Sequence, residues 1–186
     1  MNGVLDAAVE VDQLLQRTGL PYCLIGGIAL QRWGQPRTTL DVDVTVMTQF
    51  GNEEPAIQQL VKRFEPRITD AVEFARRSRV LLVQTSNGVG VDIALGALPF
   101  ESRMIARSTV WELDEARTLR TCSAEDLIVQ KVFAGRDQDW VDVQRVIEVR
   151  RSSLDHALIR QELEPLLELT EDHAAADRLE RLFGNH

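Results

Sequence analysis

Residues 22–47 read YCLIGGIALQRWGQPRTTLDVDVTVM, and this stretch decides the fold class. The segment 21–25 ends at Gly26-Gly27 and predicts a short strand that turns directly into a helix covering about 28–33. Residues 39–47 then alternate, with valines on one side and aspartates and a threonine on the other. This alternation predicts a second strand with one buried face and one polar face.

The polar face of that second strand carries two carboxylates, Asp41 and Asp43, about 6–7 Å apart along the strand. A third acid, Asp92, interrupts the run VGVDIAL at 89–95, which predicts another strand. Burying a carboxylate without compensation is costly, so acids inside Val- and Ile-rich strands indicate a role beyond packing. Carboxylates are the ligands of a Mg²⁺ ion that serves a nucleoside triphosphate, and this pattern predicts such a site. An exposed polar strand face is the alternative interpretation.

Glycines and isolated cations supply candidates for phosphate binding. Gly26 and Gly27, between a strand and a helix start, offer backbone N–H groups to an anion, although glycine pairs also mark simple turns. Lys131 is one of two lysines and lies in an apolar helical segment, where its ammonium suits a triphosphate oxygen. A solvated helix position is the alternative for Lys131. Arg37 is a candidate contact to a phosphate or to the acceptor, or else a loop charge.

The remaining pattern predicts a mixed α/β part at about 1–121 and a helical part at about 122–186. Ser123 and Asp126 form an N-terminal capping arrangement for the first helix of the second part. Ser86-Asn87-Gly88 predicts a hairpin. The further expected helices cover about 3–18, 53–64, 69–77, 100–106, 123–133, 137–150, a segment after Ser152 or Ser153, and 174–183; the further strands cover 80–83, 109–113 and 117–121, the last two as edge strands.

Composition describes a folded, soluble chain of 186 residues with 44% hydrophobic residues. No apolar run approaches the roughly 20 residues that span a bilayer, and the first residues lack the features of a secretion signal. A cytoplasmic location without membrane association is therefore expected. The net charge of −8 opposes non-specific binding to nucleic acid at long range, although arginines cluster locally.

Five motifs together resemble the DNA polymerase β-like nucleotidyltransferase superfamily. The resemblance is to its minimal bacterial branch, the AbiEii-type toxin nucleotidyltransferases. One difference from many superfamily members is that Gly27 is followed by Ile28 rather than by serine. The motifs are GGIAL at 26–30, RTTLDVD at 37–43, VDI at 91–93, EDLIVQK at 125–131, and Arg136 with DWVD at 139–142.

The resemblance implies an α/β (α+β) fold, in which helices flank a mixed sheet and a helical part follows. It also implies transfer of a nucleotidyl group from a nucleoside triphosphate, such as ATP, to a hydroxyl, with release of pyrophosphate. One or two Mg²⁺ ions would be the cofactor. The implied metal ligands and catalytic residues are Asp41, Asp43 and Asp92, and the implied nucleotide-binding residues are Gly26, Gly27, Arg37, Lys131 and Arg136.

The acceptor and the partners stay open at this point. tRNA is the acceptor suggested by toxin-type relatives, and a protein side chain or a small hydroxyl compound are alternatives. A cognate antitoxin or regulator is a possible partner. Whether Asp139 and Asp142 take part in catalysis is also open. The alternative function is an inactive nucleotide-binding or regulatory module that acts with a protein partner, although three acids would be unnecessary in a pure scaffold.

Overall fold

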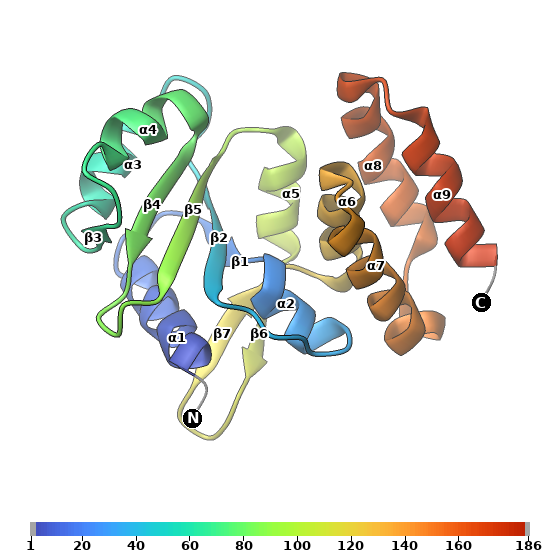
Figure 1. Ribbon diagram of the computed structural model, residues 1–186, viewed down its shortest axis with the longest axis horizontal. Coiled ribbons are helices and arrows are strands. Elements are labelled where there is room, and N and C mark those ends of the chain that lie inside the picture. Colours follow the sequence, from blue (N-terminus) through green and yellow to red (C-terminus); the bar gives the residue numbers. More distant parts are fainter. Residues whose placement is uncertain (1–2, 185–186) are drawn as a thin grey trace. The chain divides into compact units, whose positions relative to one another are not determined.

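The computed structural model describes residues 3–184 and contains a seven-stranded mixed sheet and a set of helices (Figure 1). The strand order is β3-β4-β5-β2-β1-β7-β6. This arrangement confirms the α/β (α+β) class with a mixed sheet and a C-terminal helical part. The strands are β1 (Tyr22–Leu24), β2 (Asp41–Met47), β3 (Glu65–Pro66), β4 (Val80–Gln84), β5 (Gly90–Gly96), β6 (Thr109–Glu112) and β7 (Thr118–Thr121).

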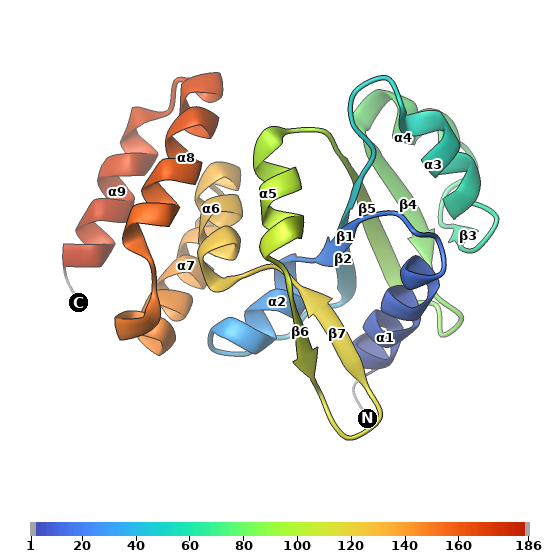
Figure 2. The same cartoon turned by 180° about the vertical axis from the view of Figure 1, so that it is seen from behind.

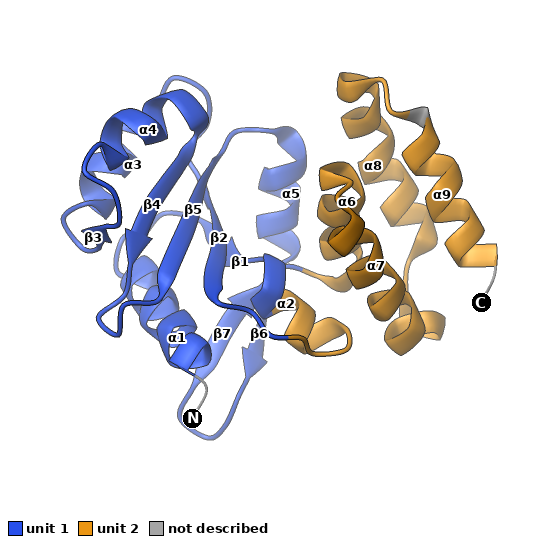
Figure 3. Cartoon of the chain, viewed as in Figure 1, with its two compact units in different colours: residues 1–28, 38–122 blue, residues 29–37, 123–186 orange. Residues whose placement is uncertain are grey.

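The helices are α1 (Gly3–Gln16), α2 (Gly26–Trp33), α3 (Glu53–Leu60), α4 (Ala71–Ser78), α5 (Pro99–Arg107), α6 (Ala124–Ala134), α7 (Asp137–Arg150), α8 (His156–Thr170) and α9 (His173–Gly184), with a short 3-10 turn at Arg151–Ser153. The chain divides into two compact units, and the division falls within α2 (Figure 3). Unit 1 comprises residues 1–28 and 38–122, and unit 2 comprises residues 29–37 and 123–186. The domain boundary expected after residue 121 stays a prediction.

The centre of the sheet in unit 1 is the parallel pair β2 and β5. Their register places Val42 beside Val91, Asp43 beside Asp92 and Val44 beside Ile93. Because strand side chains alternate between faces, the valines and isoleucine share one face and the aspartates share the other.

The valine face of the sheet is covered by α1, α3 and α4. Their apolar side chains join those of the strands in one buried core, which includes Val11, Ile57 and Ala75. Helix α1 packs against β1, β2 and β7, and α4 packs against β4 (Figure 2). Because only one face of the central strands contributes to this core, apolar and polar residues alternate along each of these strands.

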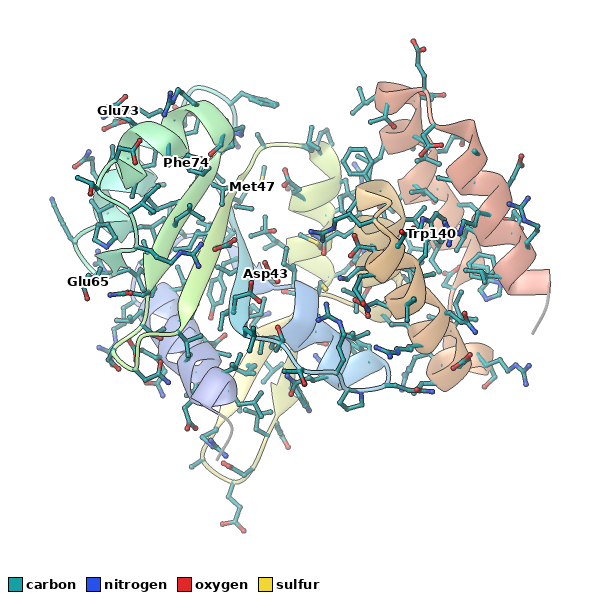
Figure 4. All side chains as sticks on the ribbon, in the orientation of Figure 1. Asp43, Met47, Glu65, Glu73, Phe74 and Trp140 are labelled. Carbon is teal, nitrogen blue, oxygen red and sulfur yellow. The ribbon has the colours of Figure 1, made fainter. Side chains whose placement is uncertain are left out.

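The opposite face is only partly covered. Helix α5 packs near β2, where Thr45 is 1% exposed, whereas Asp41 and Asp43 further back along the strand are half-buried. The side chain of Asp43 projects from this part of β2 (Figure 4). The acids therefore lie on a face that stays accessible to solvent.

Two details differ from the sequence expectations. The two-residue strand β3 was not predicted, because two residues are too few to show a period. The strand at 118–121 is not at an edge, because β7 lies between β1 and β6. The predicted hairpin is confirmed by the antiparallel pairing of β4 with β5.

Unit 2 is built from α6 to α9 together with the end of α2. The predicted capping arrangement is confirmed, because the Ser123 hydroxyl accepts a hydrogen bond from the Asp126 N–H at 3.1 Å. Gly135 ends α6 in the left-handed conformation, at φ 67°. Within residues 3–184, no helix combines the length and apolar character that crossing a membrane requires.

Candidate active site

Three sequence-predicted acids lie on one face of the unit 1 sheet. Asp43 and Asp92 are register partners on the adjacent parallel strands β2 and β5. Neighbouring strands are about 4.8 Å apart, so the two side chains project side by side. Asp41, two residues before Asp43, projects from the same face beside Gly90. Strand register therefore places Asp92, which is remote in the sequence, on the same face as Asp41 and Asp43.

The glycine pair belongs to the start of α2 rather than to a loop before it. Gly26 has φ +55°, and a Cβ built on it would lie 2.1 Å from Asp43 Oδ2. Only glycine allows this backbone conformation without strain and leaves room for the carboxylate at this point. Asp43 is thus packed against the first turn of a helix, where backbone N–H groups and the helix dipole favour negative charge.

Gly27 has a similar steric role in the same turn. A Cβ there would lie 2.3 Å from the Thr39 hydroxyl oxygen. That hydroxyl lies 3.3 Å from Asp41 Oδ1 and donates toward it. Both glycines therefore make space for side chains of the segment that carries the acids.

Asp92 takes part in an ion pair that the sequence did not predict. Its Oδ1 accepts a hydrogen bond from Arg67 Nη2 at 2.7 Å, and both side chains are 35% exposed. Arg67 directly follows the two-residue strand β3, which is too short to show a periodic pattern in the sequence. The sequence offered one indication of this contact, which is Gly90 in β5. Glycine in a strand often marks a close approach of another group.

The three carboxylates fit a hard divalent cation chemically, since Mg²⁺ prefers carboxylate oxygens and keeps several waters. They are not yet gathered around one point: within residues 3–184, no three His, Cys, Asp or Glu side chains form a group ready to hold a metal ion. Strand register places the three acids on one face of the sheet, and their assignment as metal ligands stays a prediction.

The cations predicted to bind nucleotide belong to an ionic cluster in unit 2. Lys131 Nζ lies 2.8 Å from Asp139 Oδ1 and 3.0 Å from Asp142 Oδ2, and its side chain is 8% exposed. Arg37 Nε donates to both oxygens of Asp142, at 3.1 and 3.2 Å. Arg136 Nε donates to Asp139 at 2.6 Å. These pairs give the three cations a structural role, and their role in nucleotide binding stays a prediction.

The electrostatics of this cluster favour ionised carboxylates. Burial acts to raise the pKa of Asp139, but hydrogen bonds from Arg136 and Lys131 outweigh it and hold the pKa below its ordinary value. For Asp142, burial is likewise outweighed by hydrogen bonds from Arg37 and Lys131, which lower its pKa. Both acids therefore stay charged in the folded protein, and each neutralises more than one cation.

Comparison with known families identifies the class of the protein. The model of the family described as "Nucleotidyl transferase AbiEii toxin, Type IV TA system" matches residues 14–182, which is most of the chain. The chain therefore belongs to this nucleotidyltransferase family. Membership confirms the enzyme class and the branch that the sequence motifs indicated.

Solved structures support the fold. A nucleotidyltransferase-like antigenic protein from Paracoccidioides brasiliensis is similar with a TM-score of 0.59 and 18% identity, covering 96% of this chain and 93% of its own. The antibiotic-resistance factor ANT(2'')-Ia is similar with a TM-score of 0.51 and 17% identity, over the full length of both chains. No curated protein sequence matches the chain.

Proposed function

We propose that this protein transfers a nucleotidyl group from a nucleoside triphosphate to a hydroxyl acceptor, with Mg²⁺ bound by Asp41, Asp43 and Asp92. The observation that carries the proposal is the in-register pairing of Asp43 with Asp92 on the polar face of the sheet, beside Asp41. Membership of a nucleotidyltransferase family supports the reaction class. The half-exposed position of the acids leaves them accessible to a substrate.

In the proposed reaction, the acceptor hydroxyl attacks the α-phosphorus of the triphosphate. A new P–O bond forms, the bond to the β-phosphate oxygen breaks, and pyrophosphate leaves with that electron pair. Bound Mg²⁺ would neutralise charge that develops on the phosphate oxygens. The three carboxylates would hold that cation, and Asp92 is also the candidate to accept the hydroxyl proton.

Gly26 and Gly27 would bind the phosphates of the nucleotide through their backbone N–H groups. They form the first turn of α2, where N–H groups without a partner inside the helix point toward an anion. Because Asp43 packs against Gly26, the acid-bound cation and the backbone donors would act on the same phosphate group.

For the acceptor we propose tRNA, since the family is named for toxins, and the partner we propose is a cognate antitoxin.

The test uses the full chain with Mg²⁺ and each of the four α-labelled nucleoside triphosphates, offered total tRNA, cellular protein or a small-molecule extract. We expect labelled tRNA from the native protein and at least about a hundredfold less from Asp43→Asn. Asp70→Asn, an exposed acid before α4, is the matched control and should transfer label normally.

Two results would contradict parts of this proposal. Transfer by Asp43→Asn at the native rate would refute the role of the carboxylate face. Label in the small-molecule fraction rather than in tRNA would keep the reaction and replace the acceptor. Removal of divalent cations with EDTA should stop transfer, and added Mg²⁺ should restore it.

A further inference from the structure

The ion pair between Arg67 and Asp92 places a permanent positive charge at the acid face. Arg67 follows β3, and its backbone N–H donates to the Leu82 carbonyl at 3.0 Å. Leu82 is in turn the register partner of Asp92 on β5. Paired residues in neighbouring strands share a face, so the Arg67 side chain starts on the acid face and reaches across β4 to Asp92.

Gly90 provides the space that the guanidinium occupies. A Cβ built on Gly90 would lie 2.2 Å from Arg67 Nη1, and the three nearest heavy atoms all belong to Arg67. Gly90 is also the register partner of Asp41. The guanidinium therefore lies over bare backbone next to one acid of the site and is hydrogen-bonded to another.

We propose that Arg67 is a positioning residue that competes with the divalent cation for Asp92. Without the cation, Arg67 binds the Asp92 carboxylate and lowers the negative charge of the face. When the cation binds, it replaces Arg67 as the partner of Asp92. This inference depends on the proposed function, because it assigns the three acids to a cation site.

Two interactions of weak-to-moderate strength compete for the Asp92 carboxylate: the ion pair with Arg67 and the binding of the divalent cation. Arginine stays protonated at any working pH, so its charge repels a cation wherever the guanidinium stays near the acids. A partly exposed ion pair is worth little by itself, so a divalent cation held by several carboxylates can displace it. Arg67 would therefore weaken cation binding without preventing it, and removing its charge should strengthen binding.

The experiment measures Mn²⁺ affinity of the full chain without nucleotide, by the loss of the free-ion signal in electron paramagnetic resonance. We expect Arg67→Gln to bind Mn²⁺ about three- to tenfold more tightly than the native protein. Arg67→Lys keeps the charge and should stay within about twofold of the native value. Arg77→Gln is the matched control, because it removes one charge from an exposed arginine on α4 and should leave the affinity unchanged.

Gly90→Ala changes the position of the Arg67 guanidinium without removing its charge. The added methyl group meets the flexible end of the Arg67 side chain and displaces it, while the net charge stays the same. We expect tighter Mn²⁺ binding in this variant too. Circular dichroism of each variant checks that the fold is kept.

Asp43→Asn distinguishes failure of this inference from failure of the proposed function. If Mn²⁺ binding does not depend on Asp43, the cation site is wrong and both proposals fall. If binding depends on Asp43 but Arg67→Gln binds no more tightly than Arg77→Gln, only the competition by Arg67 is refuted. Tighter binding by Arg67→Gln and Gly90→Ala, with Arg77→Gln unchanged, supports the proposal.

Discussion

At the residue scale, Lys131 is a single buried cation that forms ion pairs with more than one carboxylate. It is almost fully buried and pairs with two carboxylates, Asp139 and Asp142, which are 1% and 0% exposed. The sequence indicated that a lysine on this apolar helix was unusual, but it could not show which groups surround it. Both partners come from the next helix, α7, and one of them, Asp142, also accepts hydrogen bonds from Arg37, which is distant in the sequence.

Replacing Lys131 by methionine should destabilise the protein strongly. The change leaves buried carboxylates short of a cation, and breaking such a buried pair costs roughly 3 kcal/mol of unfolding free energy. Arg136→Met is the matched control, because the Arg136 side chain is 75% exposed and its removal should cost about 1 kcal/mol or less. Urea denaturation followed by circular dichroism measures both. Equal losses in the two variants would contradict the structural importance of Lys131.

At the scale of secondary-structure elements, the start of α2 links backbone conformation to the site. Gly26 combines a left-handed φ with a close approach of Asp43, and both depend on the absence of a Cβ. The sequence predicted the strand-to-helix turn here, but it placed the helix start two residues later, because glycine has a low helix propensity. In the structure the helix begins at Gly26, whose missing Cβ leaves room for the Asp43 carboxylate.

Gly26→Ala should therefore reduce nucleotidyl transfer as well as stability. The left-handed conformation alone costs a non-glycine residue about 1–2 kcal/mol. Gly88→Ala is the matched control, because Gly88 has φ +77° but no neighbouring atom within 4 Å of a built Cβ. Both variants should lose stability in thermal unfolding, whereas only Gly26→Ala should lose transfer of label. Loss of transfer in both would show that the effect is general destabilisation.

At the scale of the whole molecule, the buried acids predict how stability depends on pH. Asp139 and Asp142 have lowered pKa values in the folded protein, so near their ordinary unfolded pKa, about 3.9, the unfolded chain binds more protons than the folded one. Stability from these groups is therefore complete well above pH 4. It falls from about pH 5 downward, as the pH drops toward and through the folded pKa values.

Urea denaturation at several pH values between 7 and 3 tests this dependence. We expect the native protein to lose unfolding free energy below about pH 5, and Asp139→Asn to lose less over the same range because one titrating group is gone. At pH 7 the variant should be the less stable of the two. Parallel curves for the two proteins would show that acid destabilisation comes from other groups.

The sequence by itself determined the local elements and the faces of the central strands. The alternation of valine with aspartate in β2, the glycine pair at the start of α2 and the Ser123 cap are all set by residues that are neighbours in the chain. Such patterns express local backbone geometry, which has a fixed period in each type of element. The reaction class also followed from motifs in these segments, and the family match confirms it.

Only the tertiary structure decided which distant residues meet. The parallel register of β2 with β5 places Asp43 beside Asp92, and the unpredicted strand β3 brings Arg67 within reach of the same acid. The burial of Lys131 between two aspartates is likewise a result of helix packing. The physical reason is that strand register and helix packing depend on filling a shared core, and segments far apart in the sequence carry no local signal of that fit.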